Sequence, residues 1–335
     1  MSVQAFKTRQ LNMNNILERL EAKGLQAKYV RDRALPKWWD ANLEDDPVVV
    51  AEGAGYIAKR LGLDLASVFS PDAEIEFKTQ VQAKFKKRQD IDDQSSQVVQ
   101  GLASRVAEIV SYTAQPQYLE PSGDAISIRQ HILEQYRWVN LESLLGYCWS
   151  NGIPVVHFSL PPGTKKIDGM VAKFHDRPII VICCNRKSPA WQAFILAHEL
   201  GHILWGHVKD QCIVDEAITQ DDQDSEEGEA NDFAATLLLG HPQHYVWDSR
   251  IQPGRLADIA RSYSIRDTVD PALVCNNYGW RRHNKDDWGI AGKAIKEFET
   301  EPNASVLINQ LLLQYLDLEK IDRDSQEYLQ LVTGV

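Results

Sequence analysis

Residues 188–205 read SPAWQAFILAHELGHILW. Ser188 is a good N-cap, and Pro189 suits the first turn of a helix because its missing N–H would have no partner there. The residues that follow are mostly apolar, with few polar interruptions. We therefore expect a helix that carries Ala190 through about Trp205.

This helix contains the pattern His-Glu-x-x-His at residues 198–202. Residues four apart share one face of a helix, so the imidazoles of His198 and His202 can reach a single metal ion. Glu199 follows the first histidine and lies beside the metal rather than on it. The spacing therefore predicts two nitrogen ligands for zinc and one carboxylate base.

A third protein ligand has to come from elsewhere, because catalytic zinc usually takes three and leaves the fourth position to water. Residues 226–235 read EEGEANDFAA, and the apolar positions that follow fall at helical spacing. Glu227 is the first choice. It stands four residues before Asn231, which can orient a ligand histidine from the side away from the metal. Glu229 is the reserve candidate.

Other polar residues near this motif are candidates for separate roles. His207 would lie roughly 140° from His202 around a continuing helix, so we expect it to close the helix end and not to act as a fourth ligand. His241, His244 and Tyr245 follow the second helix and are candidates to donate a hydrogen bond to an oxyanion.

A small sheet is expected before the motif. Residues 153–160 are apolar and β-branched, which is typical of a strand. Residues 169–174 and 179–183 form a predicted hairpin joined by a four-residue turn, 175–178. Upstream, helical spacing is found at 14–23 and 48–63, continues through 67–70, and recurs at 72–89 and 95–113.

Composition limits the classes of function. The chain has 335 residues, a formal net charge of −11 and five cysteines that form no regular framework. We expect reduced thiols and a cytoplasmic location, because no apolar run approaches the roughly 18 residues of a membrane span and no signal peptide is evident. The negative charge argues against direct binding of this chain to nucleic acid and against its attachment to membranes.

Together these segments resemble the ImmA/IrrE-type zinc metallopeptidases, a family of HEXXH metallo-endopeptidases found in bacteria, mobile elements and stress-response systems. The resemblance rests on residues 152–155 (GIPV), 168–169 (DG), 177–180 (RPII), 194–202 (FILAHELGH), 206–207 (GH) and 227–235 (EGEANDFAA).

The resemblance implies a ligand set and a substrate. It implies that His198, His202 and Glu227 hold one Zn²⁺ per chain and that Glu199 activates water. The implied substrate is a protein, usually a helix-turn-helix transcriptional repressor or an antitoxin, often encoded beside the peptidase.

The expected fold is α+β: a zincin-like catalytic domain, with a small sheet and the HEXXH helix, between a mostly helical N-terminal domain and C-terminal helices. We place the helical N-terminal domain, which can serve partner binding, at 1–115. A linker and helix follow at 116–138, the metallopeptidase domain at 139–250 and the C-terminal helical region at 251–335.

Two other functions remain open. The first is a regulatory or toxin-like protein that keeps zinc and acts by binding its partner without proteolysis. An intact Glu199 favours the enzyme, because a structural zinc site has no need of a base. The second is direct DNA binding by the N-terminal helices, which the negative charge disfavours.

Overall fold

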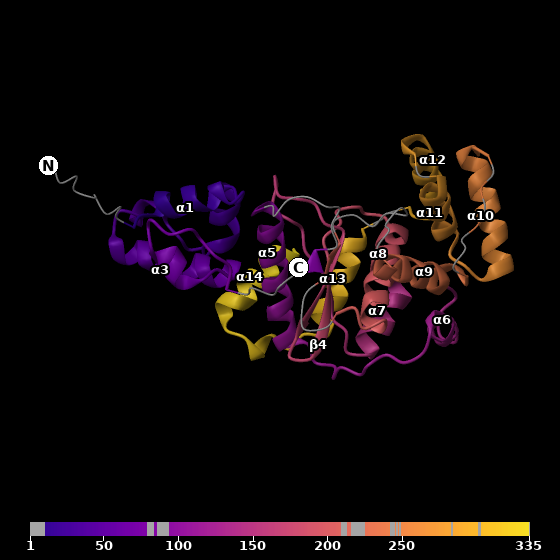
Figure 1. Cartoon of the computed structure of the whole chain (residues 1–335), viewed down its shortest axis with the longest axis horizontal. Helices are drawn as coiled ribbons and strands as arrows, with labels where there is room; N and C mark the ends of the chain where they lie inside the picture. The colour runs from indigo at the N-terminus through magenta and orange to yellow at the C-terminus, as the bar shows by residue number, and fades with distance from the viewer. Residues whose placement is uncertain are drawn as a thin grey trace.

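The computed structural model describes residues 11–78, 84–85, 94–208, 213–215, 225–241, 245, 247, 249–282, 284–300 and 303–334. Figure 1 shows an elongated molecule in which the sheet lies between two groups of helices. The N-terminal helices form one end, and α6 and α9 to α12 form the other. The α+β class expected from the sequence is confirmed.

The N-terminal unit is helical, as expected. Its helices are α1 (Met13–Ala22), α2 (Ala27–Tyr29) with its π-helical continuation η1 (Val30–Ala34), the 3-10 turn η2 (Ala41–Leu43), α3 (Pro47–Leu61) and α4 (Leu65–Phe69). Asp46 caps α3 by accepting the N–H of Val48, and Gly62 ends it in the left-handed conformation. Local capping signals therefore set both ends of the longest helix in this unit.

The helix predicted over 72–89 is wrong in the part that is described. The N–H of Asp64 bonds to the carbonyl of Glu76, and the N–H of Lys78 bonds to the carbonyl of Gly62. These long-range bonds take backbone groups that a helix would need, so residues 72–78 run as a turn and an extended segment. The strand β1 (Lys84–Phe85) follows.

The sheet has the strand order β1-β5-β3-β4-β2. The other strands are β2 (Val155–His157), β3 (Gly169–Phe174), β4 (Arg177–Ile182) and β5 (Ile213–Asp215). β3 is antiparallel to β4 and to β5, whereas β2 is parallel to β4. Val171 and Ile180 face one hydrophobic core, and Met170 and Val181 face the other. Both faces of the sheet are buried, which explains why its strands read as continuous apolar runs.

The β3–β4 hairpin is present, but its turn is tighter than predicted. Only His175 and Asp176 lie between the strands, and both have positive φ, 51° and 61°. Two residues with positive φ make the mirror-image turn whose twist matches that of paired strands. Arg177 and Pro178 therefore belong to β4, where Pro178 pairs with Lys173.

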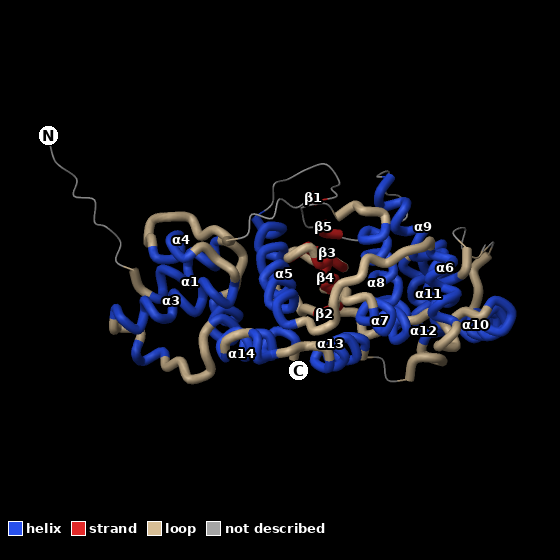
Figure 2. The backbone as a smooth tube through the Cα atoms, turned by 90° about the horizontal axis from the view of Figure 1, so that it is seen from below, coloured by secondary structure: helices blue, strands red, loops and turns tan. Residues whose placement is uncertain are grey.

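Helices cover the two faces of the sheet (Figure 2). α5 (Gln94–Thr113) lies on one face, and α7 (Leu141–Ser150) and α8 (Pro189–Leu204) lie on the other. α13 (Ala304–Gln314) runs beside β2. The side-chain amide of Asn309 accepts the N–H of His157 at 2.8 Å and donates to its carbonyl at 2.9 Å. α13 thus covers the edge strand β2 and provides hydrogen-bond partners for the backbone N–H and C=O of His157.

The remaining helices form the end opposite the N-terminal unit and the C-terminal segment that runs back to this unit. They are α6 (Ala125–Leu133), α9 (Ser225–Leu239), α10 (Pro253–Asp267), α11 (Pro271–Arg282), α12 (Lys285–Ile295), the 3-10 turn η3 (Leu318–Lys320) and α14 (Arg323–Thr333). Within the described ranges, no helix combines the length and the apolar character needed to cross a lipid bilayer.

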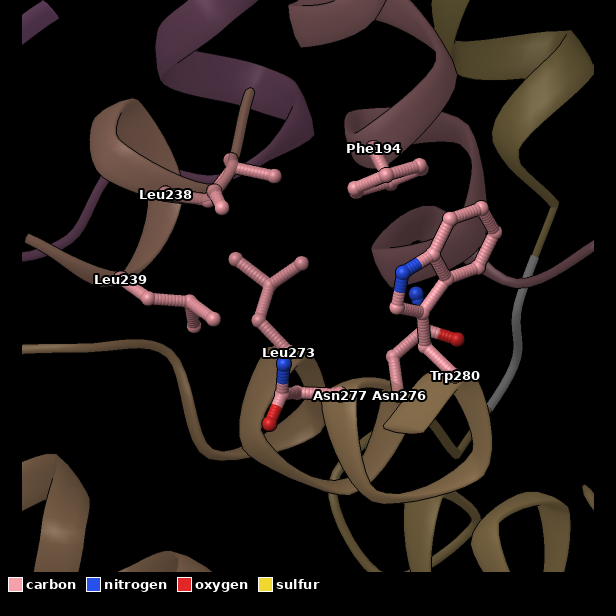
Figure 3. A pocket seen from close by; sticks show the side chains of 8 residues that line it. Phe194, Leu238, Leu239, Leu273, Asn276, Asn277 and Trp280 are labelled. Atoms are coloured by element: carbon pink, nitrogen blue, oxygen red, sulfur yellow. The ribbon is translucent and has the colours of Figure 1, made fainter. Parts of the chain in front are cut away.

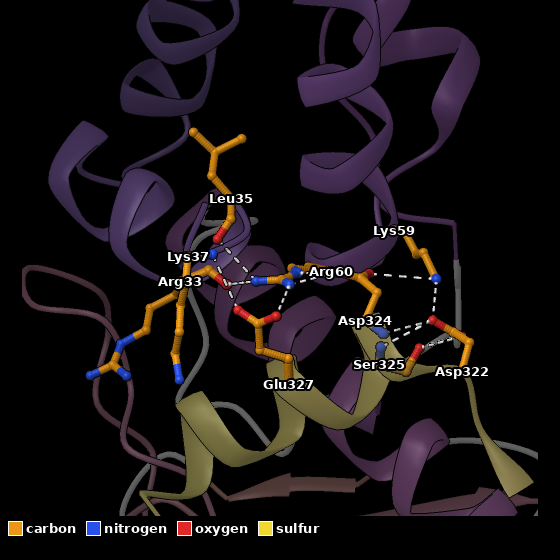
Figure 4. A network of polar contacts seen from close by, with 9 residues as sticks. All are labelled: Arg33, Leu35, Lys37, Lys59, Arg60, Asp322, Asp324, Ser325 and Glu327. Carbon is orange, nitrogen blue, oxygen red and sulfur yellow. Dashed lines mark hydrogen bonds and ion pairs between the residues drawn. The ribbon is translucent and has the colours of Figure 1, made fainter. Parts of the chain in front are cut away.

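α14 brings the C-terminal segment back to the N-terminal unit (Figure 4). Arg60 of α3 is 1% exposed, and its guanidinium contacts Asp324 at 2.5 Å and Glu327 at 3.5 Å, both on α14. The same guanidinium donates to the carbonyl of Leu35 at 3.0 Å. α5, which the sequence placed with the N-terminal domain, also packs on β3 and β4. The domain boundaries at 115, 138 and 250 remain a prediction.

Candidate metal centre

Helix α8, which carries the His-Glu-x-x-His pattern, begins at Pro189 and is capped from two sides. Ser188 accepts the N–H of Trp191 at 3.4 Å, as its sequence predicts. Glu299, far along the chain, accepts the N–H of Ala190 at 2.8 Å. Burial raises the pKa of Glu299. The start of α8 is therefore held by its own sequence and by a tertiary contact.

α8 and α9 pack closely against each other. A Cβ atom on Gly201 would lie 3.2 Å from the Cα of Ala230 and 3.1 Å from the ring of Phe233. A glycine between the two motif residues Leu200 and His202 lets the backbone of α9 come near enough for its short acidic side chains to reach the histidines. The close approach of the helices thus depends on this one position.

Three side chains converge in the buried space between these helices. His198 and His202 are fully buried, and Glu227 is 3% exposed. Nε2 of His198 lies 3.1 Å from Nε2 of His202, and the carboxylate oxygens of Glu227 lie 3.2 Å and 3.4 Å from these two nitrogens. No other group of three such ligands is found in the part of the chain that the structure describes.

The triangle fits a tetrahedral ion. Two ligand atoms bound about 2.0–2.1 Å from tetrahedral zinc lie roughly 3.3 Å apart, and the three observed separations are close to that value. Two imidazoles and one carboxylate are also a donor set that zinc takes in catalytic sites. The residues present therefore fit a zinc ion without rearrangement.

Electrostatics at the triangle favour a cation. Burial alone would raise the pKa of Glu227, but hydrogen bonds and charge interactions with His198 and His202 outweigh it and hold this pKa well below its usual range. The carboxylate is therefore ionised in a buried place, where a divalent cation would compensate its charge.

Glu199 is buried but lies outside the triangle. Its carboxylate lies against Gly169, at the start of β3. Burial raises the pKa of the Cys183 thiol, and the nearby charge of Glu199 adds to this effect. Glu199 thus occupies the position between the metal-binding helix and the sheet, one residue away from the ligand His198.

Each ligand histidine has a partner on its other nitrogen. Nδ1 of His198 lies 3.1 Å from Oδ1 of Asn231, one helical turn after Glu227. Nδ1 of His202 lies 2.9 Å from Nδ1 of His207, and Nε2 of His207 lies 3.1 Å from Glu229. Glu229 is therefore placed behind the ligands and not among them.

The sequence reasoning missed this arrangement of His207. The helix was expected to end at about Trp205, and the angle given for His207 holds only for a helix that continues, whereas Gly206 has φ 67° and turns the chain back. A glycine just after the last periodic residue is a recognisable stop signal and would have placed His207 beside the final turn. The backbone of His207 does close the helix end, as expected, because its N–H bonds to the carbonyl of His202 at 3.0 Å.

The three oxyanion candidates have other surroundings or are not described. The hydroxyl of Tyr245 donates to Asp267 at 2.8 Å, and its ring packs on Tyr263. His241 lies against the ring of Tyr245. His244 lies outside the described residues. His241 is therefore not part of the group formed by His198, His202 and Glu227.

An apolar pocket continues along the seam between α8 and α9 (Figure 3). Phe194 stands one turn before His198, and α11 closes the far side with Leu273, Asn276 and Trp280. Oδ1 of Asn276 is buried and has no hydrogen-bond partner among the described residues. Two of the three helices that line the pocket, α8 and α9, also carry His198, His202 and Glu227.

Comparison with known proteins identifies the segment that holds these residues. Residues 150–244 match the model of a peptidase family described as the IrrE N-terminal-like domain. No curated protein and no solved structure matches the chain.

Proposed function

Since residues 150–244 belong to the IrrE N-terminal-like peptidase family, we propose that the chain is a zinc-dependent endopeptidase. One observation supports a zinc-dependent mechanism in particular. A buried triangle of two imidazoles and a carboxylate is accompanied by a second carboxylate, Glu199, that is not part of it. A metal site that served structure alone would not need Glu199.

His198, His202 and Glu227 would hold the zinc ion. Bound zinc would supply Lewis acidity and lower the pKa of a water ligand toward neutrality. Asn231 keeps His198 in the orientation that turns its Nε2 toward the triangle, because the amide oxygen accepts a hydrogen bond from Nδ1.

Glu199 is the proposed general base. Its carboxylate accepts a proton from the attacking water as the oxygen adds to the scissile carbonyl carbon. It then delivers that proton to the amide nitrogen as the C–N bond breaks. The carboxylate is buried, and the absence of a side chain at Gly169 leaves the space that it occupies.

We propose that the substrate is a protein, in particular a helix-turn-helix repressor or an antitoxin, whose cleavage relieves repression in a stress response or a toxin-antitoxin system. Proteins that bind DNA carry basic surfaces, and a net charge of −11 favours encounter with them.

A groove beside α9 has a suitable character for such a partner. It combines the exposed Trp205 and the partly buried Leu204 with the carboxylates of Asp124, Glu229 and Asp232. None of its ten lining residues is basic. An apolar and basic segment of the substrate would be complementary to this groove, and Asp232→Lys should weaken its binding.

The decisive experiment compares the wild-type protein with Glu199→Gln. Both are loaded with zinc and incubated with the protein encoded beside this chain. Glu199→Gln keeps the shape of the side chain and removes the proton acceptor, so cleavage should fall at least about a hundredfold while zinc content and partner binding persist.

The same variants separate the enzyme from a binding protein. If Glu199→Gln retains the full cellular effect of the wild type, the protein acts by holding its partner, and the peptidase proposal fails. Absence of zinc in the wild-type protein after zinc is supplied would reject the metal centre itself.

A further inference from the structure

A second imidazole stands directly behind one of the proposed zinc ligands. His207 is 8% exposed, and its Nδ1 lies 2.9 Å from Nδ1 of His202. Its other nitrogen lies 3.1 Å from Oε2 of Glu229. The three side chains form a line that runs from the half-exposed Glu229 to the buried ligand.

From this line we infer that His207 and Glu229 are positioning residues, which hold His202 in the tautomer and orientation that present its Nε2 to the metal. The inference rests on the metal centre proposed above. It assigns to Glu229 a role different from that of Glu227, although both stand in the first turns of α9.

The chain is folded so that His207 can reach His202. Gly206 adopts φ 67°, its N–H bonds to the carbonyl of Ile203 at 3.1 Å, and the N–H of His207 bonds to the carbonyl of His202 at 3.0 Å. This pair of bonds is the common helix-ending motif that uses a left-handed glycine. The motif returns the chain to the last turn of α8 and sets the two imidazoles side by side.

The proton positions follow from the acceptor at the end of the line. A carboxylate oxygen accepts hydrogen bonds, so in the inferred arrangement Nε2–H of His207 donates to Glu229. In a neutral imidazole the other nitrogen is then an acceptor, and Nδ1 of His207 accepts from Nδ1–H of His202. Nε2 of His202, which faces the triangle, then carries no hydrogen, which is the state that binds a metal ion.

The other proposed ligand, His198, is held by one residue instead of two. Nδ1 of His198 lies 3.1 Å from the amide oxygen of Asn231, which accepts its hydrogen directly. α9 therefore supplies three functions within five residues: Glu227 toward the metal, Asn231 behind His198, and Glu229 behind His202 through His207. Glu227 and Asn231 share a helix face, whereas Glu229 points to another side and needs His207 as a bridge.

The test measures zinc affinity of the full-length protein by competition with a chelator. Loss of a hydrogen-bond partner behind a ligand histidine usually costs about 10–100-fold in metal affinity, and we expect a loss in this range for His207→Leu. His207→Gln should recover much of the affinity, because its amide oxygen can accept from His202. Glu229→Ala should lose about fivefold to tenfold, and Glu229→Gln, which keeps an acceptor oxygen, should lose less.

Two comparisons exclude a merely structural or electrostatic cause. Glu226→Ala removes a negative charge from the same turn of α9 and should leave zinc affinity within about twofold. The apo variants should unfold at nearly the temperature of the apo wild type. Nitrogen-15 shifts of the His202 ring should show hydrogen at Nδ1 in the wild type and a mixture of tautomers in His207→Leu.

A double variant makes the connection specific. If Glu229 acts through His207, adding Glu229→Ala to His207→Leu should cost no further affinity, whereas independent effects would add. Additive losses, or equal losses for Glu229→Ala and Glu226→Ala, would overturn the inference. If His207→Leu does not fold, the comparison of Glu229→Ala with Glu226→Ala decides alone. A wild-type protein that binds no zinc contradicts the proposed function, whereas unchanged zinc affinity in all variants contradicts only this inference.

Discussion

Gly169 and Glu199 touch: a Cβ atom on Gly169 would lie well within 3.0 Å of Oε1 of Glu199. The first residue of β3 therefore has to be a glycine for the carboxylate to keep its place. Neither residue's local sequence reveals this contact, because they are brought together by the packing of α8 on the sheet.

Gly169→Ala should consequently damage the proposed chemistry without removing the metal. The new methyl group displaces the Glu199 carboxylate, and misplacement of a base by about 1 Å can cost a hundredfold in rate. We expect zinc content near that of the wild type and a loss of cleavage approaching that of Glu199→Gln. The control is Gly228→Ala, where an added Cβ meets nothing within 4 Å. Full activity in Gly169→Ala would contradict the role given to Glu199.

Glu227→Gln should lose zinc far more severely than Glu229→Gln. The two carboxylate oxygens of Glu227 face one imidazole nitrogen each, whereas Glu229 contacts His207. We expect at least about a hundredfold weaker binding for the first variant, beyond the range usual for residues behind the ligands. The double variant His198→Ala with His202→Ala should abolish binding. The reverse order of the two glutamates, measured by chelator competition, would reject the assignment of Glu227.

Arg60→Ala should destabilise the whole chain. The buried guanidinium joins α3 to Asp324 and Glu327 of α14, and its removal leaves Glu327 without its cation and Asp324 with only the longer contact to Lys59 at 3.5 Å. Breaking a buried ion pair in this way costs about 3 kcal/mol or more in the free energy of unfolding. Lys59→Ala is the control, since Lys59 is 43% exposed, pairs with Asp322 at the surface and reaches Asp324 only at 3.5 Å, so we expect a cost under about 1 kcal/mol. Equal urea midpoints for the two variants would contradict this expectation.

Asp287 should make part of the stability depend on acid pH. Burial opposes ionisation of Asp287, but hydrogen bonds from Tyr278, Asn284 and Arg282 outweigh it and hold the pKa below the ordinary value of 3.8. The folded protein then binds fewer protons at this site than the unfolded chain. Its stabilising contribution is therefore present above about pH 3.8 and is lost as pH falls through the folded-state pKa.

Urea unfolding at about pH 6 and about pH 3 measures this effect. Asp287→Asn should reduce the difference between the two midpoints, while the exposed neighbour change Asp286→Asn should leave it as in the wild type. An unchanged difference in Asp287→Asn would show that other carboxyls dominate the acid loss.

The arrangement around the metal-binding helix followed from local sequence to a large extent. Helical periodicity, with Ser188 and Pro189 at the start of α8, placed His198 and His202 on one face of that helix. The four-residue offset likewise placed Glu227 and Asn231 on one face of α9. These relationships depend only on the geometry of one helix, which a short stretch of sequence specifies. Strand identity in the hairpin was likewise local, although its turn was two residues and not four.

Only the tertiary structure decided which distant groups meet these side chains. The bond from Glu299 to the start of α8, the contact of Glu199 with Gly169 and the bridge from Glu229 through His207 each join segments that lie far apart or turn away from the helix. The extended path of residues 72–78 was also set by bonds to the ends of α3 and α4. Periodicity describes one element at a time, whereas these contacts depend on how elements pack, and packing depends on the whole chain at once.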